Sequence, residues 1–565
     1  MATLLETMAH VDESGHPEHN GVSGSNETAG GVNPFHGDQH RQFLASYLEK
    51  GEDTMLAFMT AHLRTGGAYW GLNCLDLMRY DIGETLTLDQ KEFVAPRPVV
   101  GASAPSTGNS STPNGHATVG KEDDVGATNF KGVAAVETTP AQVVGTVDVD
   151  SSSSSSSSKA ILKRWILDCQ NPDGGFSSNP GQDSHITSTQ YALLVLCLLE
   201  EDDEEHETTS TTSQNVNGDS TTRGAAINKH KRRIIQCLET ETIDIDLNLL
   251  TEQHIQEREG RKRENKKTGE HEQNYGAEPE AKGAQGSGTI MMTRKEAILR
   301  FVQSRQLPRD EKTKGACFAA DKWGENDTRF VYGAFSICRV LLRDDATARV
   351  EDWVNVDAAC AYLRSCYNPD GGFGWKPGSE SHAASCWVCL AALSLVNRID
   401  SQVDRDQTGW FLCSRQTDFG GFNGRPEKAP DVCYSWWILA SLQIIQKMHW
   451  IDDVKLRKWI LECQDTEEGG IADRPGNMPD PFHTFFGVAA LSLLNFANGS
   501  SGGASGHIGE VATGGPVGFA ATRTSRATAT TSKKGGKGIE IRDLKPINPT
   551  FALPVDTLET LGLVS

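Results

Sequence analysis

The chain has 565 residues and a formal net charge of -21 at pH 7. This acidity argues against a nucleic-acid partner, and the longest apolar runs, such as YALLVLCLL (191–199), have about half the length of a membrane span. Thirteen cysteines without a disulfide-scaffold spacing and an N-terminus without a signal peptide predict a cytoplasmic protein with free thiols and no transmembrane segment.

Four segments have compositions that cannot bury enough apolar surface to fold. They are rich in Gly, Ser, Thr or charged residues, and one ends in eight consecutive serines. We expect a disordered tail over 1–35, followed by a single domain over 36–565. Disordered low-complexity insertions are expected to interrupt this domain at about 97–158, 201–290 and 499–538.

The rest of the chain repeats. Paired glycines begin at Gly174, Gly371, Gly420 and Gly469, as in SCYNPDGGF (365–373), and KGACF (314–318) is a degenerate copy. A helix-like segment precedes each pair, and a polar loop and an apolar segment of about 12 residues follow it. The pattern predicts an all-α fold of five or six helical hairpins, with the glycines as turns, which stack into an open solenoid or close into a ring.

Polar residues recur eleven positions after the first glycine of each clear copy, at His185, His382, Asp431 and Asp480. Cys433 and His483 follow the last two. Asp431, Cys433 and His483 come from adjacent repeats and offer three ligands of the kind that catalytic zinc uses. The alternative interpretation is a helix N-cap for the aspartate and core packing for the thiol.

Cationic residues precede this site in the loop RPEKAPD (425–431). Arg425 and Lys428 suit a diphosphate, His382 enters from the previous repeat, and Tyr434 adds a hydroxyl donor. Surface ion pairs in a solvated loop are the alternative. Four aromatic residues line an apolar channel or belong to the ordinary core: Tyr69, Trp70, Trp436 and Trp437. The CxxC of CWVC (386–389) indicates core packing.

Several long motifs resemble the β subunits of protein prenyltransferases, and most of all those of the Rab geranylgeranyltransferase type (type II). They are GAYWGLNCLDLM (67–78), WGENDTRF (323–330), GGFGWKPGSESHA (371–383), RPEKAPDVCYSWWILASLQII (425–445), DPFHTFFGVAALSLL (480–494) and the final PINPTFALP (546–554). The resemblance covers nearly all of the chain outside the four low-complexity segments.

The resemblance implies an α/α toroid whose funnel-shaped cavity holds the reaction. It implies a zinc ion bound by Asp431, Cys433 and His483, and an isoprenoid diphosphate bound by His382, Arg425, Lys428 and Tyr434. An obligate α subunit would complete the site. The implied reaction is transfer of geranylgeranyl from geranylgeranyl diphosphate to C-terminal cysteines of Rab GTPases, which an escort protein presents, by way of a zinc-activated thiolate.

Lipid contacts and a second metal are implied by the same resemblance. Arg329 and Tyr332 match positions near the lipid pocket, and Trp437 would contact the lipid. Gly66 stands where farnesyl enzymes carry a tryptophan, so we expect room for a twenty-carbon chain, and Gly66→Trp to favour farnesyl diphosphate. Asp473 matches a residue that helps to bind Mg²⁺ in farnesyltransferases.

Three rival functions are weighed against this one. Geranylgeranyltransferase type I, which acts on CaaX proteins, carries a lysine at the position of Asp473. A squalene-type cyclase would need a DxDD motif, which is absent from the sequence. A non-catalytic helical scaffold would not need the zinc and diphosphate residues.

Overall fold

The computed structural model describes residues 33–49, 63–88, 157–199, 236–246, 249, 289–312, 314–343, 348–497 and 539–564. The chain divides into two units, Met1–Phe93 with Ser157–Ser565, and Val94–Ser156. The second unit lies outside the described residues, as do nearly all of the intervals 1–35, 97–158 and 499–538 that we expected to be disordered. All of the described residues belong to the first unit.

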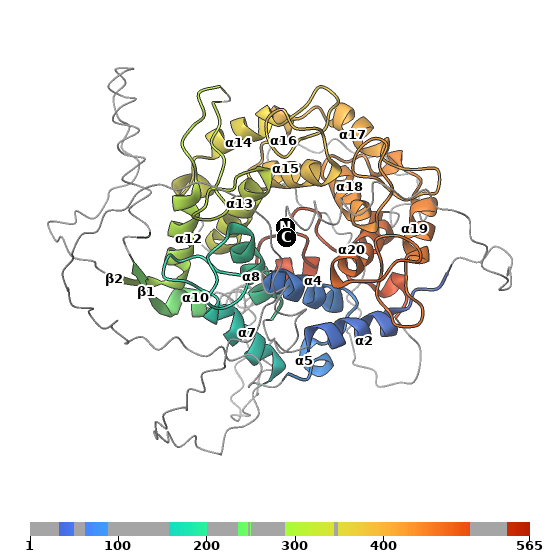
Figure 1. The fold of residues 1–565 in the computed structure, drawn as a ribbon, viewed down its shortest axis with the longest axis horizontal. Helices are drawn as coiled ribbons and strands as arrows, with labels where there is room; N and C mark the ends of the chain where they lie inside the picture. Colours follow the sequence, from blue (N-terminus) through green and yellow to red (C-terminus); the bar gives the residue numbers. More distant parts are fainter. Residues whose placement is uncertain are drawn as a thin grey trace, which may run out of the picture. The chain divides into compact units, whose positions relative to one another are not determined.

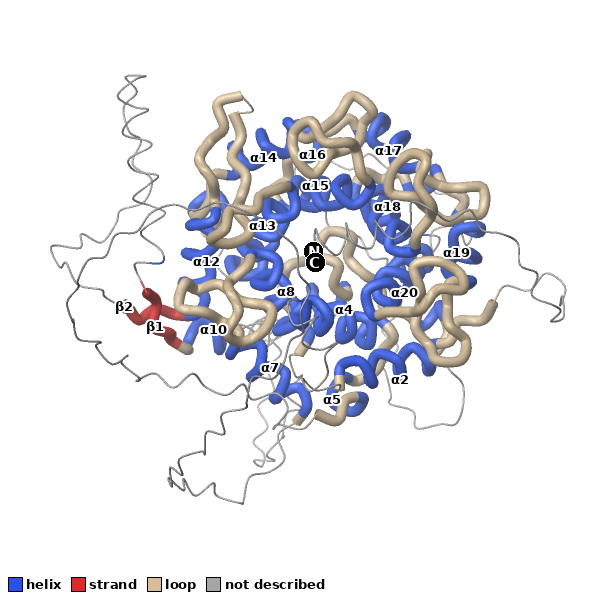
Figure 2. The backbone as a smooth tube through the Cα atoms, in the orientation of Figure 1, coloured by secondary structure: helices blue, strands red, loops and turns tan. Residues whose placement is uncertain are grey.

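Six helical hairpins form a closed ring in the described residues, so the predicted all-α toroid is confirmed (Figures 1 and 2). Each inner helix packs against the next, and the last packs against the first. The inner helices are α4 (Arg64–Leu77), α8 (Ile186–Leu198), α13 (Thr328–Leu342), α15 (Ala383–Leu395), α18 (Val432–Ile444) and α20 (Pro481–Ala497). Their outer partners are α2 (Gly37–Leu48), α7 (Ser158–Asp168), α12 (Arg294–Arg305), α14 (Val356–Ser365), α17 (Arg405–Cys413) and α19 (Asp453–Glu462).

The two layers differ in burial as their sequences predict. Inner helices are apolar all round, and α18 buries nearly every residue from Val432 to Leu442. Outer helices bury one face, as α19 does with Leu456, Trp459, Ile460 and Leu461. Short elements connect or flank the hairpins: α5 (Ile82–Thr85), η2 (Val350–Asp352), α16 (Ile399–Gln402), η3 (Met448–Trp450), η4 (Ile541–Asp543) and α21 (Val555–Thr560).

The repeated glycines are the turns between outer and inner helices. Gly371 has a φ of +86°, and a Cβ there would lie 2.5 Å from the backbone oxygen of Gln407 in the next hairpin. Only glycine fits this conformation and this close approach. An isolated β-bridge closes each turn, and the degenerate copy has one too: Gln170 with Phe176, Gln306 with Phe318, Tyr367 with Phe373, Gln416 with Phe422, and Gln464 with Ile471.

Part of the interval 201–290 is folded, so the expectation of disorder does not hold there. Helix α10 (Gln236–Thr240) leads into β1 (Thr242–Asp246), which pairs antiparallel with β2 (Thr289–Thr293). Ile245 is fully buried, and the amide of Asp246 donates to the carbonyl of Pro172. The buried Ile245 packs against Ala297 of α12 and anchors this strand to the ring, although the surrounding composition is polar.

Helix α2 closes the ring against the last hairpin. The amide of Gly470 donates to Nδ1 of His40 at 2.9 Å, so Nε2 carries the proton and donates to Oε1 of Gln464 at 3.0 Å. Burial, followed by the nearby His36, lowers the pKa of His40 to about 4. This neutral histidine therefore joins the first hairpin of the ring to the last.

Candidate metal centre and central cavity

Asp431, Cys433 and His483 meet at the start of two neighbouring inner helices. We call them the metal triad. One ligand atom from each lies within 4.8 Å of the other two, and Cys433 and His483 are buried. The spacing of the sequence repeats thus identified residues that the fold brings together. A carboxylate, a thiol and an imidazole are ligands that Zn²⁺ prefers, and three of them leave a fourth position open.

Asp480 orients the imidazole of the triad. Its Oδ2 lies 2.6 Å from Nδ1 of His483, while Nε2 of His483 lies 3.3 Å from Oδ1 of Asp431. Burial alone would lower the pKa of His483, but Asp431 and Asp480 raise it to about 10. Each ring nitrogen therefore faces a carboxylate oxygen. Since this position favours a cation and the ring is held from its far side, the residues fit a zinc ion.

Asp431 fits both interpretations given for it, the metal ligand and the helix N-cap. Asp431 is the N-cap of α18, because its carboxylate accepts the amide of Cys433 at 2.8 Å. His185 and His382 cap α8 and α15 in the same way. The recurrent position is therefore a capping position in each of these repeats, and in one of them it is also a member of the metal triad.

His382 and Tyr434 form a second polar group beside the triad. Nδ1 of His382 accepts the amide of Ala384 at 3.2 Å, and Nε2 lies 3.3 Å from the hydroxyl of Tyr434. Burial, followed by the charge of Arg425, lowers the pKa of His382 to about 4, so the ring is neutral. Nε2 then carries the proton and donates to Tyr434, whose own hydroxyl proton is left to bind another acceptor.

Arg425 and Lys428 lie in the loop before α18. The guanidinium of Arg425 pairs with Glu380 at 2.8 Å, with both side chains partly exposed, as the surface-pair alternative anticipated. Lys428 is exposed. Arg425 pairs with Glu380, two residues before the cap of α15, and Lys428 lies three residues before the cap of α18, so the positive ends of two helix dipoles also favour an anion here.

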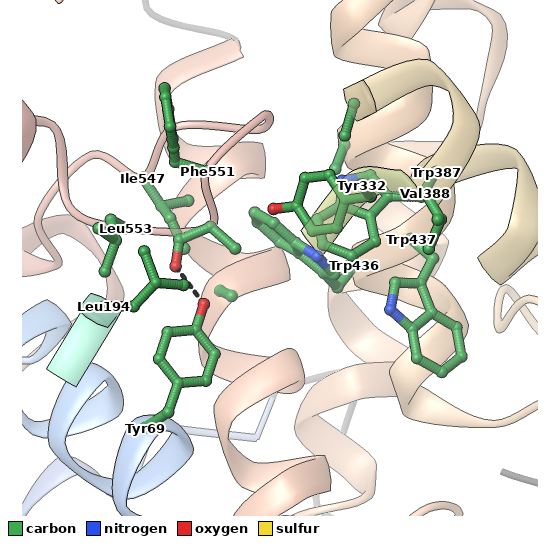
Figure 3. Close-up of a cluster of buried hydrophobic side chains, with 14 of the residues drawn as sticks. Tyr69, Leu194, Tyr332, Trp387, Val388, Trp436, Trp437, Ile547, Phe551 and Leu553 are labelled. Carbon is green, nitrogen blue, oxygen red and sulfur yellow. Dashed lines mark hydrogen bonds between the residues drawn. The ribbon is translucent and has the colours of Figure 1, made fainter. Parts of the chain in front are cut away.

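A central cavity with about 620 Å³ of empty space, open mouth included, lies inside the ring. Four residues expected at the lipid site line it: Arg329, Tyr332, Trp437 and Tyr69. Sequence reasoning did not identify the other lining residues: Thr187, Gln190, Tyr191, Leu194, Trp375, Ala384, Trp387, Val388, Phe486 and Ala552. Figure 3 shows Tyr332, Trp387 and Trp437 on one side of this space and Tyr69 on the other.

The triad lies one helical turn from the cavity wall. Cys433 precedes the wall residue Trp437 by four positions on α18, and His483 precedes Phe486 by three on α20. Residues at these spacings share a helix face, so the polar groups stand at one end of an aromatic chamber. Trp70 and Trp436 do not line the cavity; both are buried core.

Neither Gly66 nor Asp473 lines the cavity, but Asp473 lies beside the triad, because its backbone carbonyl accepts the amide of Val432 at 2.8 Å. Gly66 is buried in α4, and a Cβ there would lie 3.4 Å from the rings of Trp70 and Tyr191. Asp473 accepts hydrogen bonds from Arg474 and Asn477 in its own turn. In the described residues, no other carboxylate, thiol or histidine joins Asp473 in a metal-type cluster.

The cysteines agree with the prediction of free thiols and of core packing for the CxxC. All thirteen cysteines are free, and Cys386 and Cys389 of the CxxC are fully buried. Burial raises the pKa of Cys386 to about 12. None of the described helices has the length and apolar character that crossing a membrane requires.

A closed ring of helical hairpins, with a carboxylate, a thiol and an imidazole at one end of an aromatic chamber, defines the class of α/α toroid proteins with a metal-type centre. The family described as the prenyltransferase alpha-alpha toroid domain matches residues 35–100, 142–231 and 286–553. The chain therefore belongs to this family, and the resemblance seen in its motifs is confirmed.

Individual relatives are similar over shorter stretches. The geranylgeranyl transferase type-2 subunit beta of Candida albicans is 44% identical over 108 residues, which is 19% of this chain and 28% of the relative. The type-2 subunit beta of Saccharomyces cerevisiae is 47% identical over 119 residues, which is 21% of this chain and 33% of the relative. The type-1 subunit beta of Arabidopsis thaliana is 40% identical over 78 residues, 14% and 18%. The matched stretches span about a third or less of these relatives.

Proposed function

We propose that this chain is the catalytic β subunit of a Rab geranylgeranyltransferase in the cytoplasm. It would transfer geranylgeranyl from geranylgeranyl diphosphate to C-terminal cysteines of Rab GTPases presented by an escort protein, in an obligate heterodimer with an α subunit. The observation that carries the proposal is the metal triad one helical turn from an aromatic cavity. The similarity to type-2 β subunits in two yeasts supports the Rab branch.

The cavity and the metal triad would bind the two reactants, the isoprenoid and the substrate thiol. The apolar rings of the cavity would hold the isoprenoid and keep water from its first carbon, C1. Asp431, Cys433 and His483 would hold Zn²⁺, which when bound lowers the pKa of a substrate thiol from about 8.5 and so supplies a thiolate near neutral pH. In the transfer, the cysteine sulfur bonds to C1 as the C1–O bond breaks, and the electron pair leaves with diphosphate.

The leaving group is stabilised by donors of this chain. The free hydroxyl proton of Tyr434 can bind a diphosphate oxygen, because His382 already donates to the oxygen of that hydroxyl. Arg425 would exchange Glu380 for the diphosphate, and Lys428 would add a second charge. Donors placed where negative charge develops lower the barrier most when they are held in position beforehand.

A transfer assay tests this proposal. The chain is co-expressed with a cognate α subunit and given radiolabelled geranylgeranyl diphosphate with three acceptors: a Rab with its escort, a CaaX peptide ending in Leu, and one ending in Ser. We expect label on the Rab alone. Label on the Leu peptide alone would identify a type I enzyme, the alternative that the Arabidopsis relative favours.

Matched variants separate the enzyme from a helical scaffold. Cys433→Ser removes a ligand of the triad, whereas Cys413→Ser removes a thiol from outer helix α17. We expect about one zinc per heterodimer in the wild type and in Cys413→Ser, and loss of both zinc and transfer in Cys433→Ser. A wild-type heterodimer without zinc would contradict the mechanism.

A further inference from the structure

The floor of the central cavity is made by the chain's own C-terminal segment. We call residues 546–554 the C-terminal loop. Ala552 of this loop is 3% exposed and is the loop residue that lines the cavity. Its neighbours Ile547, Phe551 and Leu553 are also buried in the core (Figure 3).

Hydrogen bonds within the loop fix its shape. The side-chain oxygen of Asn548 accepts the amides of Thr550 at 2.9 Å and Phe551 at 3.1 Å. The amide of Ala552 donates to the carbonyl of Asn548, and the amide of Asn548 donates to the carbonyl of Leu553, both at 2.9 Å. Four short-range bonds thus define a tight turn with Ala552 within it.

Side chains from three inner helices hold the carbonyls of the loop. Tyr69 and Asn73 of α4 both donate to the carbonyl of Ala552 at 2.7 Å. Tyr332 of α13 donates to Thr550, and Trp387 of α15 to Pro549, each at 2.9 Å. Tyr69, Tyr332 and Trp387 are themselves wall residues, so the walls and the floor form one hydrogen-bonded unit.

The backbone of Ala552 is held in a conformation that alanine disfavours. Its φ is +54°, a left-handed value that costs a residue with a Cβ roughly 1–2 kcal/mol. The surrounding hydrogen bonds hold it there, so the floor cannot easily retreat when a larger side chain is introduced. A single methyl group is the whole side chain at this position.

We propose that residue 552 sets the length of the isoprenoid that the cavity accepts; this rests on the proposed function. The small side chain of Ala552 leaves space at the floor of the cavity, and a larger side chain would occupy the space of the terminal five-carbon unit of the isoprenoid. Gly66, by contrast, does not line the cavity, and the rings of Trp70 and Tyr191 already lie against it. Residue 66 could affect chain length only by displacing Tyr191.

Three substitutions in the heterodimer test residue 552. Ala552→Leu adds apolar bulk, Ala552→Asn adds bulk with a residue that tolerates positive φ, and Ala552→Gly removes the methyl and the strain. The measurement is direct binding of labelled farnesyl and geranylgeranyl diphosphates, expressed as the ratio of their Kd values. We expect Leu and Asn to weaken geranylgeranyl binding at least about tenfold relative to farnesyl binding, since five buried carbons are lost.

The glycine variant and the rival position complete the test. Ala552→Gly should fold and keep the wild-type preference for the longer chain, while Gly66→Trp should change the ratio less than Ala552→Leu. If the Ala552→Leu variant does not fold, the Kd ratios of Ala552→Asn and Ala552→Gly are compared instead. Unchanged ratios in folded Leu or Asn variants would overturn the inference while the proposed function stands. A wild-type heterodimer that binds neither diphosphate would overturn the proposed function itself.

Discussion

His382 and Tyr434 join two neighbouring hairpins through an edge-to-face ring contact with centroids 5.5 Å apart, and through a 3.3 Å contact between Nε2 and the hydroxyl. Another repeat contains a simpler form of this joint, because His185 meets Phe330 at the same 5.5 Å without a hydroxyl. The His382–Tyr434 pair, which we propose binds the diphosphate, is therefore a packing contact between hairpins to which one hydroxyl oxygen has been added.

Tyr434→Phe should keep the ring contact and lose the oxygen. We expect kcat for transfer to fall by about 10²-fold, the typical effect of one donor to developing charge, with little change in the thermal unfolding midpoint. Tyr367→Phe, which removes a hydroxyl from the turn between α14 and α15, is the control. Equal rates for Tyr434→Phe and wild type would contradict the role proposed for the hydroxyl.

Asp480→Asn should weaken zinc binding without removing a ligand. The carboxylate holds Nδ1 of His483 at 2.6 Å, and loss of such a support typically lowers metal affinity 10- to 100-fold. Competition with a chelator of known affinity measures the change. An affinity equal to that of wild type would show that the imidazole does not depend on Asp480.

Asp473→Asn examines the proposed magnesium site. If Asp473 helps to bind Mg²⁺ at the diphosphate, the variant should need several-fold more Mg²⁺ for half-maximal transfer and should retain its zinc. The structure gives Asp473 local partners, Arg474 and Asn477, so a purely structural carboxylate would leave the Mg²⁺ titration unchanged.

Two glycines of one loop should respond differently to alanine. At Gly371 a Cβ would lie 2.5 Å from backbone of the next hairpin, whereas at Gly378, whose φ is +81°, nothing lies within 4 Å. Gly378→Ala should cost about 1 kcal/mol of unfolding free energy through φ alone. Gly371→Ala should cost at least about 2 kcal/mol more, measured by denaturant unfolding. Equal costs would show that the close approach is relieved by backbone movement.

The buried, neutral His40 should make stability depend on pH. Its folded pKa of about 4 lies below the ordinary 6.5, so its contribution is fully present above pH 6.5 and is lost as pH falls towards 4. Complete protonation of His40 would lower the free energy of unfolding by about 3 kcal/mol. His40→Gln should therefore lose less stability than wild type between pH 7.5 and 5, in denaturation midpoints measured at both. Parallel losses would mean that His40 does not titrate in this range.

The sequence alone predicted the ring and the triad better than it predicted the cavity. Glycine spacing located the turns, and counting from them located Asp431 and His483, because a turn and a cap occur at fixed offsets within each repeat. Asp480 as the orienting group had a signal too, three residues before His483, but it was counted only as a repeat position.

The cavity floor had no comparable signal. The bonds from Tyr69 and Tyr332 to the C-terminal loop span 483 and 218 positions and end on backbone carbonyls, which no side-chain pattern reveals. Strand β1 was missed for a related reason, since its anchor is one isoleucine, Ile245, within a polar interval. Local periodicity predicts hairpins well, whereas contacts between distant segments depend on the closed ring.

Closure of that ring also bears on how the protein is made. The bond between His40 and Gln464 joins residues 424 positions apart. In an open solenoid each new repeat completes the surface of the one before, but here helix α2 leaves the ribosome long before the hairpin that covers it exists. Its partner surface becomes available only near the end of synthesis. A chain truncated before Gln464 would therefore leave uncovered the face of α2 that contacts the last hairpin.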